Sequence, residues 1–493
     1  MSKHSNQHMS TDEFRKQGKK VIDWIADYYD QIEQYPVLSQ VKPGEIRSNL
    51  PESAPLKGRD YGDILSDMDK MMPGITHWQS PNFHAFFPCA TSGPAILGDL
   101  ISTGLGIQGM IWASSPACTE VETHVLDWLV DMMDLPKKFK STASGGGVLQ
   151  DTASSSSLVA LIAARERTSH GDTNLNGSNR QLTVYTSQQA HSSIEKAVKI
   201  AGMGKNNLRL VNVDSTFAMD PKHLKELIEN DLAQGLIPTF VCATVGTTSS
   251  TAMDPLKEIG NICTEYGIWL HVDAAMAGPA ALCLEFRFIN DGLNFADSYT
   301  FNPHKWMLTN FDCNVFYVAN RKVLIDSLSI LPEYLKNKAT DSKTVIDYRD
   351  WGIPLGRRFR ALKLWHVINY YGVEGLQAFI RGHVENTQKL KSWIEADERF
   401  EIVAPVPLNL ICFRHQNGNE FNENLVNSLN ESGKIYLTHT KLNGQYIIRF
   451  SVGQTSTTLD HLKKSWDYIL ETVKKIKAFQ PTQPIRHRCS SGG

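Results

Sequence analysis

The sequence predicts an α/β protein whose main domain holds a largely parallel sheet. Between about residues 80 and 325, apolar strand-like runs alternate with helical patterns, as in Thr239–Val245, the helix-like Pro255–Glu265 and Ile268–Val272. Such alternation is typical of strands joined by helical crossovers. The length of 493 residues, with 41% hydrophobic and 21% charged residues, fits roughly two to four ordinary globular domains.

The first segment is predicted to be a helical arm. Ser10 followed by Glu13 resembles a capping box, and an apolar stripe at helical spacing runs from Phe14 to Tyr28. The next stretch, Pro36–Pro55, contains several prolines and little periodicity. We therefore expect an extended arm there, of the kind that packs on a partner subunit.

A smaller α+β domain is predicted to follow the large one. A long helical stretch with an apolar face begins near residue 358, and strand-like Leu408–Arg414 and Tyr446–Ser451 precede a final helix from about Leu459 to Lys475. From Gln480 the prolines, serines and glycines offer little to bury, so we expect a disordered tail. The expected divisions are 1–85 for the arm, 86–357 for the large domain, 358–479 for the small domain and 480–493 for the tail.

Charge and composition argue against several functional classes. A net charge of −2 gives no electrostatic case for nucleic acid, and no apolar run approaches the length of a membrane span. The first ten residues lack the apolar core of a signal peptide. The eight scattered cysteines form neither a zinc motif nor a disulfide framework, so no metal site is expected. We expect a cytoplasmic protein that acts on a small molecule.

One lysine occupies a position suited to covalent chemistry. The run Asn302–Trp306 places Lys305 in a tight polar turn directly after the strand-like Tyr299–Phe301. Partial burial lowers the pKa of a lysine, and the neutral amine condenses with carbonyls to give Schiff bases. The alternative is an ordinary solvated lysine, but the flanking proline, histidine and tryptophan favour a nucleophile.

A glycine- and serine-rich segment resembles a phosphate cradle. Gly145–Gly147 and then Asp151–Ser157 lead into the helical Leu158–Arg167. Glycines allow a tight turn, hydroxyl groups donate hydrogen bonds, and a helix N-terminus attracts an anion. The segment lacks the Walker lysine and the dinucleotide glycine spacing. The alternative is a serine-rich N-cap after a flexible turn.

Asp273 closes the apolar strand Ile268–Val272, so we expect it at a carboxyl edge of the sheet, where open α/β folds bind ligands. A carboxylate there can stabilise a protonated pyridine nitrogen, and the alternative is an N-cap for Ala274–Met276. Asp273 precedes Lys305 by 305 − 273 = 32 residues, which fits one helix-containing connection to another strand. Nucleophilic lysine, acid and phosphate cradle together describe a site for pyridoxal 5'-phosphate.

Beyond these motifs, the chain resembles the group II pyridoxal-phosphate decarboxylases, and most closely the aromatic-L-amino-acid decarboxylases. The likeness covers about residues 10–475 and is carried by His77-Trp78, Ser115–Glu120, Gln189–Ser193, Thr244–Thr248, His271–Gly278, Asn302–Trp306 and Ile353–Arg360. It implies a fold type I architecture, similar to that of aspartate aminotransferase, and a homodimer with its active site at the subunit interface.

The resemblance also implies how the cofactor is held. Lys305 matches the lysine that binds the cofactor covalently, and Asp273 matches the partner of its ring nitrogen. The other implied cofactor-binding positions are Thr152, Ala153, Ser154, His191, Thr248, Ala275 and Asn302. Asp151-Thr152 replaces the glycine-serine of animal relatives, so Asp151 is expected to point away from the phosphate.

Three further catalytic roles follow from the resemblance. His191 matches the imidazole that stacks on the pyridine ring near the substrate carboxylate, although an isolated histidine of this kind is more often a satisfied core residue. Tyr334 matches a tyrosine on a mobile loop that protonates Cα after carbon dioxide leaves; without the family match it would be an ordinary loop anchor. Relatives with phenylalanine there resemble aldehyde synthases, in which oxygen intercepts the carbanion. His304 either assists proton transfer or orients the cofactor.

The substrate is expected to be aromatic. The implied pocket positions are Trp78, Phe86, Phe87, Pro88, Cys89 and His191, with Gln108 and Met110 contributed by the neighbouring subunit. Phe86 and Cys89 stand where tyrosine and threonine are common, and both changes remove hydroxyls. A pocket with fewer hydrogen-bond donors discriminates less strongly for ring hydroxyls.

The expected reaction is decarboxylation of dopa, tyrosine, tryptophan or phenylalanine to the amine and carbon dioxide. An aldehyde synthase that releases peroxide and ammonia is one alternative, and a glutamate or histidine decarboxylase is another. A catalytically silent dimer that only binds the cofactor is the alternative outside enzymes.

Overall fold

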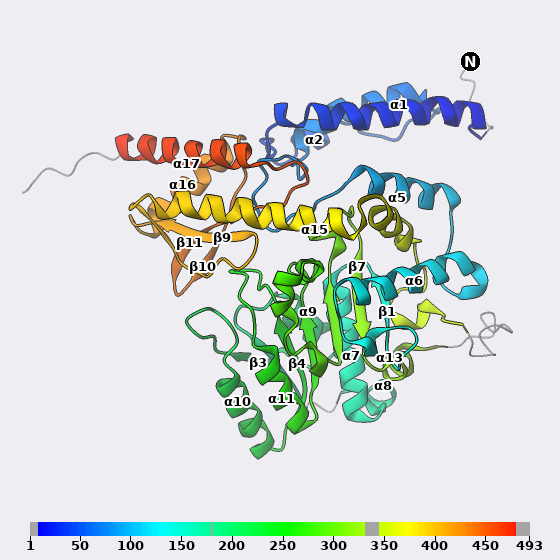
Figure 1. The fold of residues 1–493 in the computed structure, drawn as a ribbon. Helices are drawn as coiled ribbons and strands as arrows, with labels where there is room; N and C mark the ends of the chain where they lie inside the picture. Colours follow the sequence, from blue (N-terminus) through cyan, green and yellow to red (C-terminus); the bar gives the residue numbers. More distant parts are fainter. Residues whose placement is uncertain (1–7, 179–180, 331–344, 480–493) are drawn as a thin grey trace, which may run out of the picture.

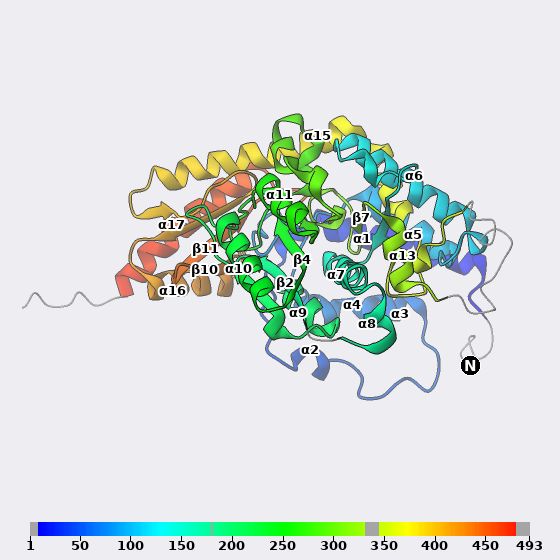
Figure 2. The same cartoon turned by 90° about the horizontal axis from the view of Figure 1, so that it is seen from below.

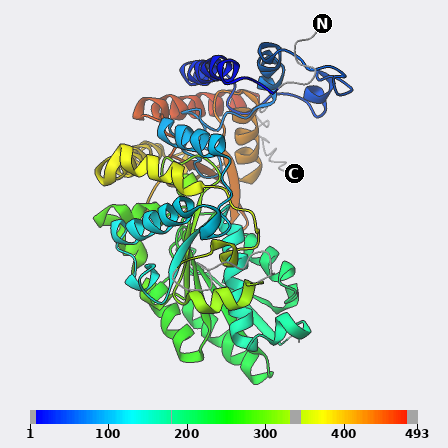
Figure 3. The ribbon, with the colours of Figure 1, turned by 90° about the vertical axis from the view of Figure 1, so that its right-hand side faces the viewer.

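The computed structural model of the chain describes residues 8–178, 181–330 and 345–479. An α/β domain occupies one end of the molecule, the N-terminal helices occupy the other, and the long helix α15 (Arg360–Glu395) lies between them (Figures 1 and 3). None of the described helices is long and apolar enough to cross a membrane.

The described part of the α/β domain contains a seven-stranded sheet in the order β1-β7-β6-β5-β4-β2-β3. Its strands are β1 (Gly146–Gln150), β2 (Leu182–Ser187), β3 (Leu208–Val211), β4 (Ile237–Thr244), β5 (Trp269–Asp273), β6 (Ser298–Phe301) and β7 (Asn314–Val318). Neighbours from β6 to β3 pair in parallel, whereas β7 is antiparallel to both β1 and β6. The prediction of a mainly parallel sheet is confirmed, with β7 reversed. That reversal brings the first residue of β7 to the carboxyl edge of its neighbours.

Helices cover both faces of this sheet, as the view from below shows for α9 and α11 on opposite sides of β4 (Figure 2). Alternate residues of β4 enter separate cores: Phe240 and Cys242 pack in one, Val241 and Ala243 in the other. A strand buried on both faces must be apolar throughout, which explains the continuous apolar runs of the sequence. The described α-helices of this domain are α6 (Pro116–Met132), α7 (Ala153–Ser169), α8 (Asp172–Asn176), α9 (Ser193–Ile200), α10 (Pro221–Ala233), α11 (Leu256–Tyr266), α12 (Pro303–Trp306) and α13 (Arg321–Leu328).

The N-terminal segment begins with helix α1 (Thr11–Asp30), and the Ser10 hydroxyl caps it by accepting the N–H of Glu13 at 3.2 Å. The expected extended stretch contains one described helix, α2 (Glu45–Ser48), and is followed by α3 (Tyr61–Ser66), α4 (Met68–Met71) and α5 (Gly93–Leu105). Val37 donates its N–H to the carbonyl of Gly433 at 2.7 Å, so this segment contacts the C-terminal part of the chain.

The C-terminal part forms an α+β layer, as the sequence predicts. Its described sheet has the order β10-β11-β9-β8, with β8 (Phe400–Ile402), β9 (Leu410–His415), β10 (Thr438–Leu442) and β11 (Gln445–Ser451), covered by α16 (Asn419–Glu431) and α17 (Leu459–Phe479). Helix α15 bends at Gly372, whose φ of 65° only glycine adopts without strain. The divisions at residues 85 and 357 stay predictions, and the predicted tail 480–493 lies outside the described residues.

Candidate active site

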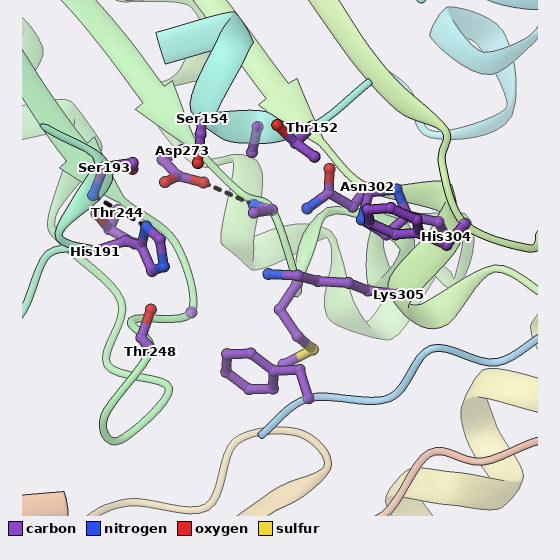
Figure 4. Close-up of a pocket in the computed structure, with 16 residues that line it drawn as sticks. Thr152, Ser154, His191, Ser193, Thr244, Thr248, Asp273, Asn302, His304 and Lys305 are labelled. Carbon is purple, nitrogen blue, oxygen red and sulfur yellow. Dashed lines mark hydrogen bonds between the residues drawn. The ribbon is translucent and has the colours of Figure 1, made fainter. Parts of the chain in front are cut away.

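A cavity of about 230 Å³ lies at the carboxyl edge of the large sheet (Figure 4). The segments that follow β1, β2, β4, β5 and β6 all contribute to its lining. The cofactor-binding residues expected from the sequence all line it: Thr152, Ala153, Ser154, His191, Thr248, Asp273, Ala275, Asn302 and Lys305. Parallel strands explain this convergence, because their carboxyl ends meet at one edge.

Lys305 lies in the single-turn helix α12, four residues after the end of β6. Its Nζ points into the cavity (Figure 4) and lies 5.2 Å from the centroid of the Phe87 ring. Burial lowers the pKa of the Lys305 amine; the Asp273 carboxylate raises it, and the Arg449 guanidinium lowers it further. A lowered pKa increases the fraction of neutral amine, which is the form that attacks a carbonyl.

Asp273 is the last residue of β5, the strand paired in parallel with β6, and only 4% of its surface is exposed. The N–H of Ala275 donates to its Oδ1 at 2.9 Å. The bond is a local turn rather than a helix cap, since the next described helical segment begins only at Gly278. A buried carboxylate directed into a cavity can pair with a protonated pyridine nitrogen.

The predicted phosphate cradle lies at the N-terminus of α7, where Thr152 is the extended N-cap residue. The Thr152 side chain makes no capping bond, so the first N–H groups of the helix remain available to an anion. Asp151 turns its Oδ1 back onto the Thr152 N–H at 2.7 Å. Asp151 is absent from the described lining of the cavity, in keeping with the expectation that it points away from a phosphate.

The glycine run does not form part of this cradle, contrary to the sequence-based prediction. Gly146 and Gly147 belong to β1 and lie before the cradle, at the opposite end of that strand. A Cβ on Gly147 would lie 2.6 Å from the Tyr317 ring, and one on Gly145 would lie 2.1 Å from the Val318 carbonyl oxygen. Close packing against β7 therefore excludes a side chain at Gly145 and Gly147, and the predicted cradle begins only after β1, at the N-terminus of α7.

His191 follows β2 and lines the cavity beside Thr248 (Figure 4). Its Nδ1 accepts the N–H of Ser193 at 3.1 Å, so a neutral ring carries its proton on Nε2. Burial lowers the pKa of His191; Asp273 raises it and Lys305 lowers it. The ring is therefore neutral near pH 7 and can stack on a planar ligand.

His304 is buried beside Lys305, and its Nδ1 accepts the N–H of Cys313 at 3.0 Å. Burial, followed by the charge of Lys305, lowers the pKa of His304 to about 3. Its ring packs edge-on against Phe311, with ring centroids 4.8 Å apart. A neutral histidine held by the backbone is better suited to orienting neighbours than to accepting a proton on Nδ1.

A second cavity of about 550 Å³ adjoins the first at Lys305 and His191. Its lining includes the predicted substrate residues Trp78, Phe86, Phe87, Pro88 and Cys89. The rings of Trp78 and Phe86 stack with centroids 5.5 Å apart. Most of the described lining is aromatic or apolar.

Sequence reasoning missed two residues of this second cavity, Phe311 and Arg449. Arg449 is 4% exposed and comes from β11 of the small domain, so no local motif connects it to Lys305. It donates to the Ser249 carbonyl at 3.2 Å and to the Thr438 hydroxyl at 3.0 Å, and its Nη2 has no hydrogen-bond partner. An arginine inside the apolar strand Tyr446–Ser451 was the available signal, because buried arginines are rare.

Gln108 and Met110 do not line either cavity in the described structure. Gln108 is exposed, and its Oε1 accepts the N–H of Arg357 at 2.6 Å; the Met110 carbonyl accepts the N–H of Arg349 at 3.0 Å. This placement leaves their expected contribution to a neighbouring subunit's site as a prediction. Tyr334 lies outside the described residues.

The site fits pyridoxal 5'-phosphate by its donor set, since one cavity joins a lysine amine of lowered pKa, a buried carboxylate and a free helix N-terminus. The sequence profile of the pyridoxal-dependent decarboxylase conserved domain matches residues 43–416. The chain belongs to this family. It is therefore a pyridoxal-phosphate-dependent decarboxylase, with the fold type I architecture.

Several known relatives are similar to this decarboxylase along nearly their whole length. Tyrosine decarboxylase 2 of Narcissus pseudonarcissus is 48% identical, over 93% of each chain. The aromatic-L-amino-acid decarboxylase of Mus musculus is 45% identical, over 95% of this chain and 99% of the relative. A phenylacetaldehyde synthase of Arabidopsis thaliana is also 45% identical, over 95% and 97%.

A solved structure shows the same fold. The structure of TDC of Oryza sativa with PLP and tryptamine superimposes with a TM-score of 0.93 at 39% identity. The match covers 96% of this chain and all of that one. The decarboxylase fold therefore extends from the N-terminal arm through the C-terminal layer.

Proposed function

We propose that this decarboxylase converts an aromatic L-amino acid into its amine and carbon dioxide, and that it works as a cytoplasmic homodimer. The observation that carries the proposal is the aromatic-lined cavity of about 550 Å³ that meets the cofactor cavity at Lys305. Aromatic walls bury a planar apolar side chain favourably. Relatives named for tyrosine, tryptophan and aromatic-L-amino-acid decarboxylation support the same substrate class.

The chain's own residues account for the chemistry. Bound pyridoxal phosphate supplies an electron sink for the electron pair left when the carboxyl group departs. Asp273 would keep the ring nitrogen of the cofactor protonated, which strengthens that sink, and the amine of Lys305 would hold the cofactor covalently. The N-terminus of α7 would hold the phosphate group, and the ring of His191 would stack on the cofactor ring.

Electrostatics of the second cavity favour an amino acid with an uncharged side chain. Its described lining contains the buried cation Arg449 and no aspartate or glutamate. A cationic side chain would therefore find no counter-ion. The aromatic residues Trp78, Phe86 and Phe311 favour an apolar ring over an acidic side chain, whose lost hydration Arg449 alone would have to offset.

Exposed apolar residues support a homodimer. Trp78 and Phe86 line the substrate cavity but remain 39% and 45% exposed, so its outer wall is incomplete in one chain. Helix α5 exposes a run of large apolar side chains at helical spacing, namely Leu97, Leu100, Ile101 and Leu105. A second copy of the chain that covers this helix and the exposed wall of the cavity would bury both apolar surfaces. The cytoplasmic assignment is supported by the free state of all seven described cysteines.

Product analysis tests the proposal. Purified protein with pyridoxal phosphate is incubated with aromatic, acidic and imidazole amino acids, and amine, aldehyde and peroxide are measured for each. We expect amine and carbon dioxide from at least one aromatic substrate and no turnover by Lys305→Ala. Turnover confined to glutamate or histidine, or none with any substrate, would overturn the aromatic assignment.

The second candidate is an aromatic aldehyde synthase, favoured by the Arabidopsis relative at 45% identity. Such an enzyme consumes oxygen and water and releases aldehyde, carbon dioxide, ammonia and hydrogen peroxide. The same assay separates the two, because only the synthase produces peroxide in step with carbon dioxide.

A further inference from the structure

Asn314 begins β7 at the carboxyl edge of the large sheet, although it lines neither cavity described above. It reaches this edge because β7 runs against its neighbours, and it pairs with Gln150, the last residue of β1. Its side chain is fully buried. A buried amide must satisfy two donors and one acceptor, so its partners define its orientation.

The hydrogen-bond partners of Asn314 determine where its side-chain nitrogen and oxygen lie. Nδ2 lies 2.7 Å from Oδ1 of Asn302, 3.0 Å from the Phe301 carbonyl and 2.9 Å from Oγ1 of Thr300. Oδ1 accepts the hydroxyl hydrogen of Ser156. A flipped amide would set an oxygen against the Phe301 and Asn302 oxygens, which repel it. The donor end therefore faces Asn302.

This contact determines what Asn302 offers to the cofactor cavity. Asn302 lines the cavity and is 2% exposed. Because its Oδ1 is taken by Asn314, its own Nδ2 is the end directed into the cavity, as Figure 4 shows. An amide nitrogen donates hydrogen bonds, and a phosphate accepts them. With the opposite orientation, Asn302 would present an oxygen that repels the anion.

The same amide ties the cradle together. Ser156 is fully buried in the first turns of α7, two residues after Ser154. Its bond to Asn314 joins α7 to β7, while the Asn302 bond joins β7 to the segment that carries Lys305. One side chain thus connects the N-terminal turns of α7 to Asn302, which lines the same cavity.

We propose that Asn314 is a positioning residue for the cofactor phosphate: it holds the Asn302 amide with its nitrogen toward the anion. The inference rests on the assignment of the Asn302 and α7 positions to the phosphate. Asn314 lines neither cavity and acts on the anion through Asn302, while its bond to Ser156 holds Asn314 itself in place.

The main test replaces the side-chain NH2 group of Asn314 by an oxygen and keeps the shape of the side chain. Asn314→Asp retains an acceptor for Ser156 but turns an oxygen toward Asn302, so the Asn302 amide is expected to rotate. The dissociation constants of pyridoxal phosphate and of phosphate-free pyridoxal are measured on the full chain from the cofactor absorbance. We expect pyridoxal phosphate to bind about 10- to 100-fold more weakly and pyridoxal to change less than about threefold, as lost hydrogen bonds to a charged group imply. Equal weakening of both ligands would overturn the proposal.

Asn314→Asp also adds a negative charge near the cavity. Asn314→Ala is the control for this charge, because it removes the partner of Asn302 without adding an anion. Both Asn314 variants are also made in an Asn302→Ala background. If Asn314 acts through Asn302, the Asn314→Ala effect on phosphate-dependent affinity shrinks to less than about threefold there. A full effect that persists without the Asn302 side chain contradicts the proposal. Asn302→Ala alone distinguishes the failures, since unchanged affinity in that variant would refute the assignment of Asn302 to the phosphate instead. Unfolding midpoints of each apoprotein identify variants that fail to fold.

Discussion

The Nζ of Lys305 lies 5.2 Å from the centroid of the Phe87 ring, and the guanidinium of Arg449 lies 5.1 Å from the same centroid. The ring, itself 7% exposed, thus carries two cation contacts inside one buried region. The Arg449 charge lowers the pKa of Lys305, because two positive charges repel in a poorly solvated site. The small domain therefore influences the nucleophile of the large domain.

Replacement of Arg449 by methionine is expected to raise the pKa of Lys305. A rise of one pKa unit lowers the free-amine fraction about tenfold at neutral pH. The pH dependence of the rate at which apoprotein takes up pyridoxal phosphate measures this pKa. Arg414→Met is the matched control, since Arg414 is a buried arginine of the adjacent strand β9 that lines neither described cavity. An equal response of both variants would contradict a direct effect of Arg449.

Gly147→Ala is expected to lower stability without weakening cofactor binding. The added Cβ would lie 2.6 Å from the Tyr317 ring, and overpacking of this kind costs about 1–3 kcal/mol. Chemical denaturation and cofactor titration measure the two effects. Gly382→Ala, in the interior of α15 with no atom within 4 Å of the new Cβ, is the control that should keep or increase stability. A large loss of cofactor affinity in Gly147→Ala would show instead that the glycine run contributes to the phosphate cradle.

Residues next to strand ends were the predictable part of this site. Asp273 ends one apolar strand and Lys305 follows another, and strand polarity alone places both at one edge. The glycine run was misassigned because a turn glycine and a glycine under a packed tyrosine look identical in sequence. Arg449 and Asn314 could not be placed, since the first depends on the packing of another domain and the second on the reversed direction of β7.

Four buried histidines are expected to make the protein sensitive to acid. Burial is the main cause that lowers the pKa values of His84 and His304 to about 3 and those of His271 and His383 to about 4. Between these values and about 6.5, the unfolded chain binds protons that the folded chain does not, so the free energy of unfolding falls as pH falls. Each histidine contributes a slope of up to about 1.4 kcal/mol per pH unit.

Denaturant unfolding at several pH values between 7.5 and 5 measures this slope. His383→Gln keeps an acceptor for the Trp306 indole N–H, which lies 3.0 Å from Nδ1 in the native protein. The variant should therefore remain folded, and its free energy of unfolding should lose the part of the pH dependence that one titrating histidine contributes. An unchanged slope would show that His383 does not titrate on unfolding.

Tyr334→Phe is expected to divert product from amine toward aldehyde. The family resemblance assigns the proton donor for Cα to this position, and phenylalanine removes the only ionisable group of the side chain. Amine, aldehyde and peroxide are quantified for wild type and variant at equal carbon dioxide release. An unchanged amine yield would remove Tyr334 from the protonation step.

Phe86→Tyr combined with Cys89→Thr is expected to sharpen the preference for ring-hydroxylated substrates. Both residues line the aromatic cavity, and each substitution adds a hydroxyl to a lining that is mostly aromatic or apolar. A buried hydroxyl that a substrate fails to pair is penalised, so discrimination comes from the unpaired group rather than from added attraction. The ratio of kcat/KM for dopa or tyrosine over phenylalanine should rise about 10-fold for the double variant. Phe86→Leu is the control, since it alters the cavity wall without adding a hydroxyl and should leave that ratio within about threefold. A double variant whose ratio matches that of the wild type would mean that these two positions do not read the ring hydroxyl, and that selectivity resides on the surface that a second subunit would supply.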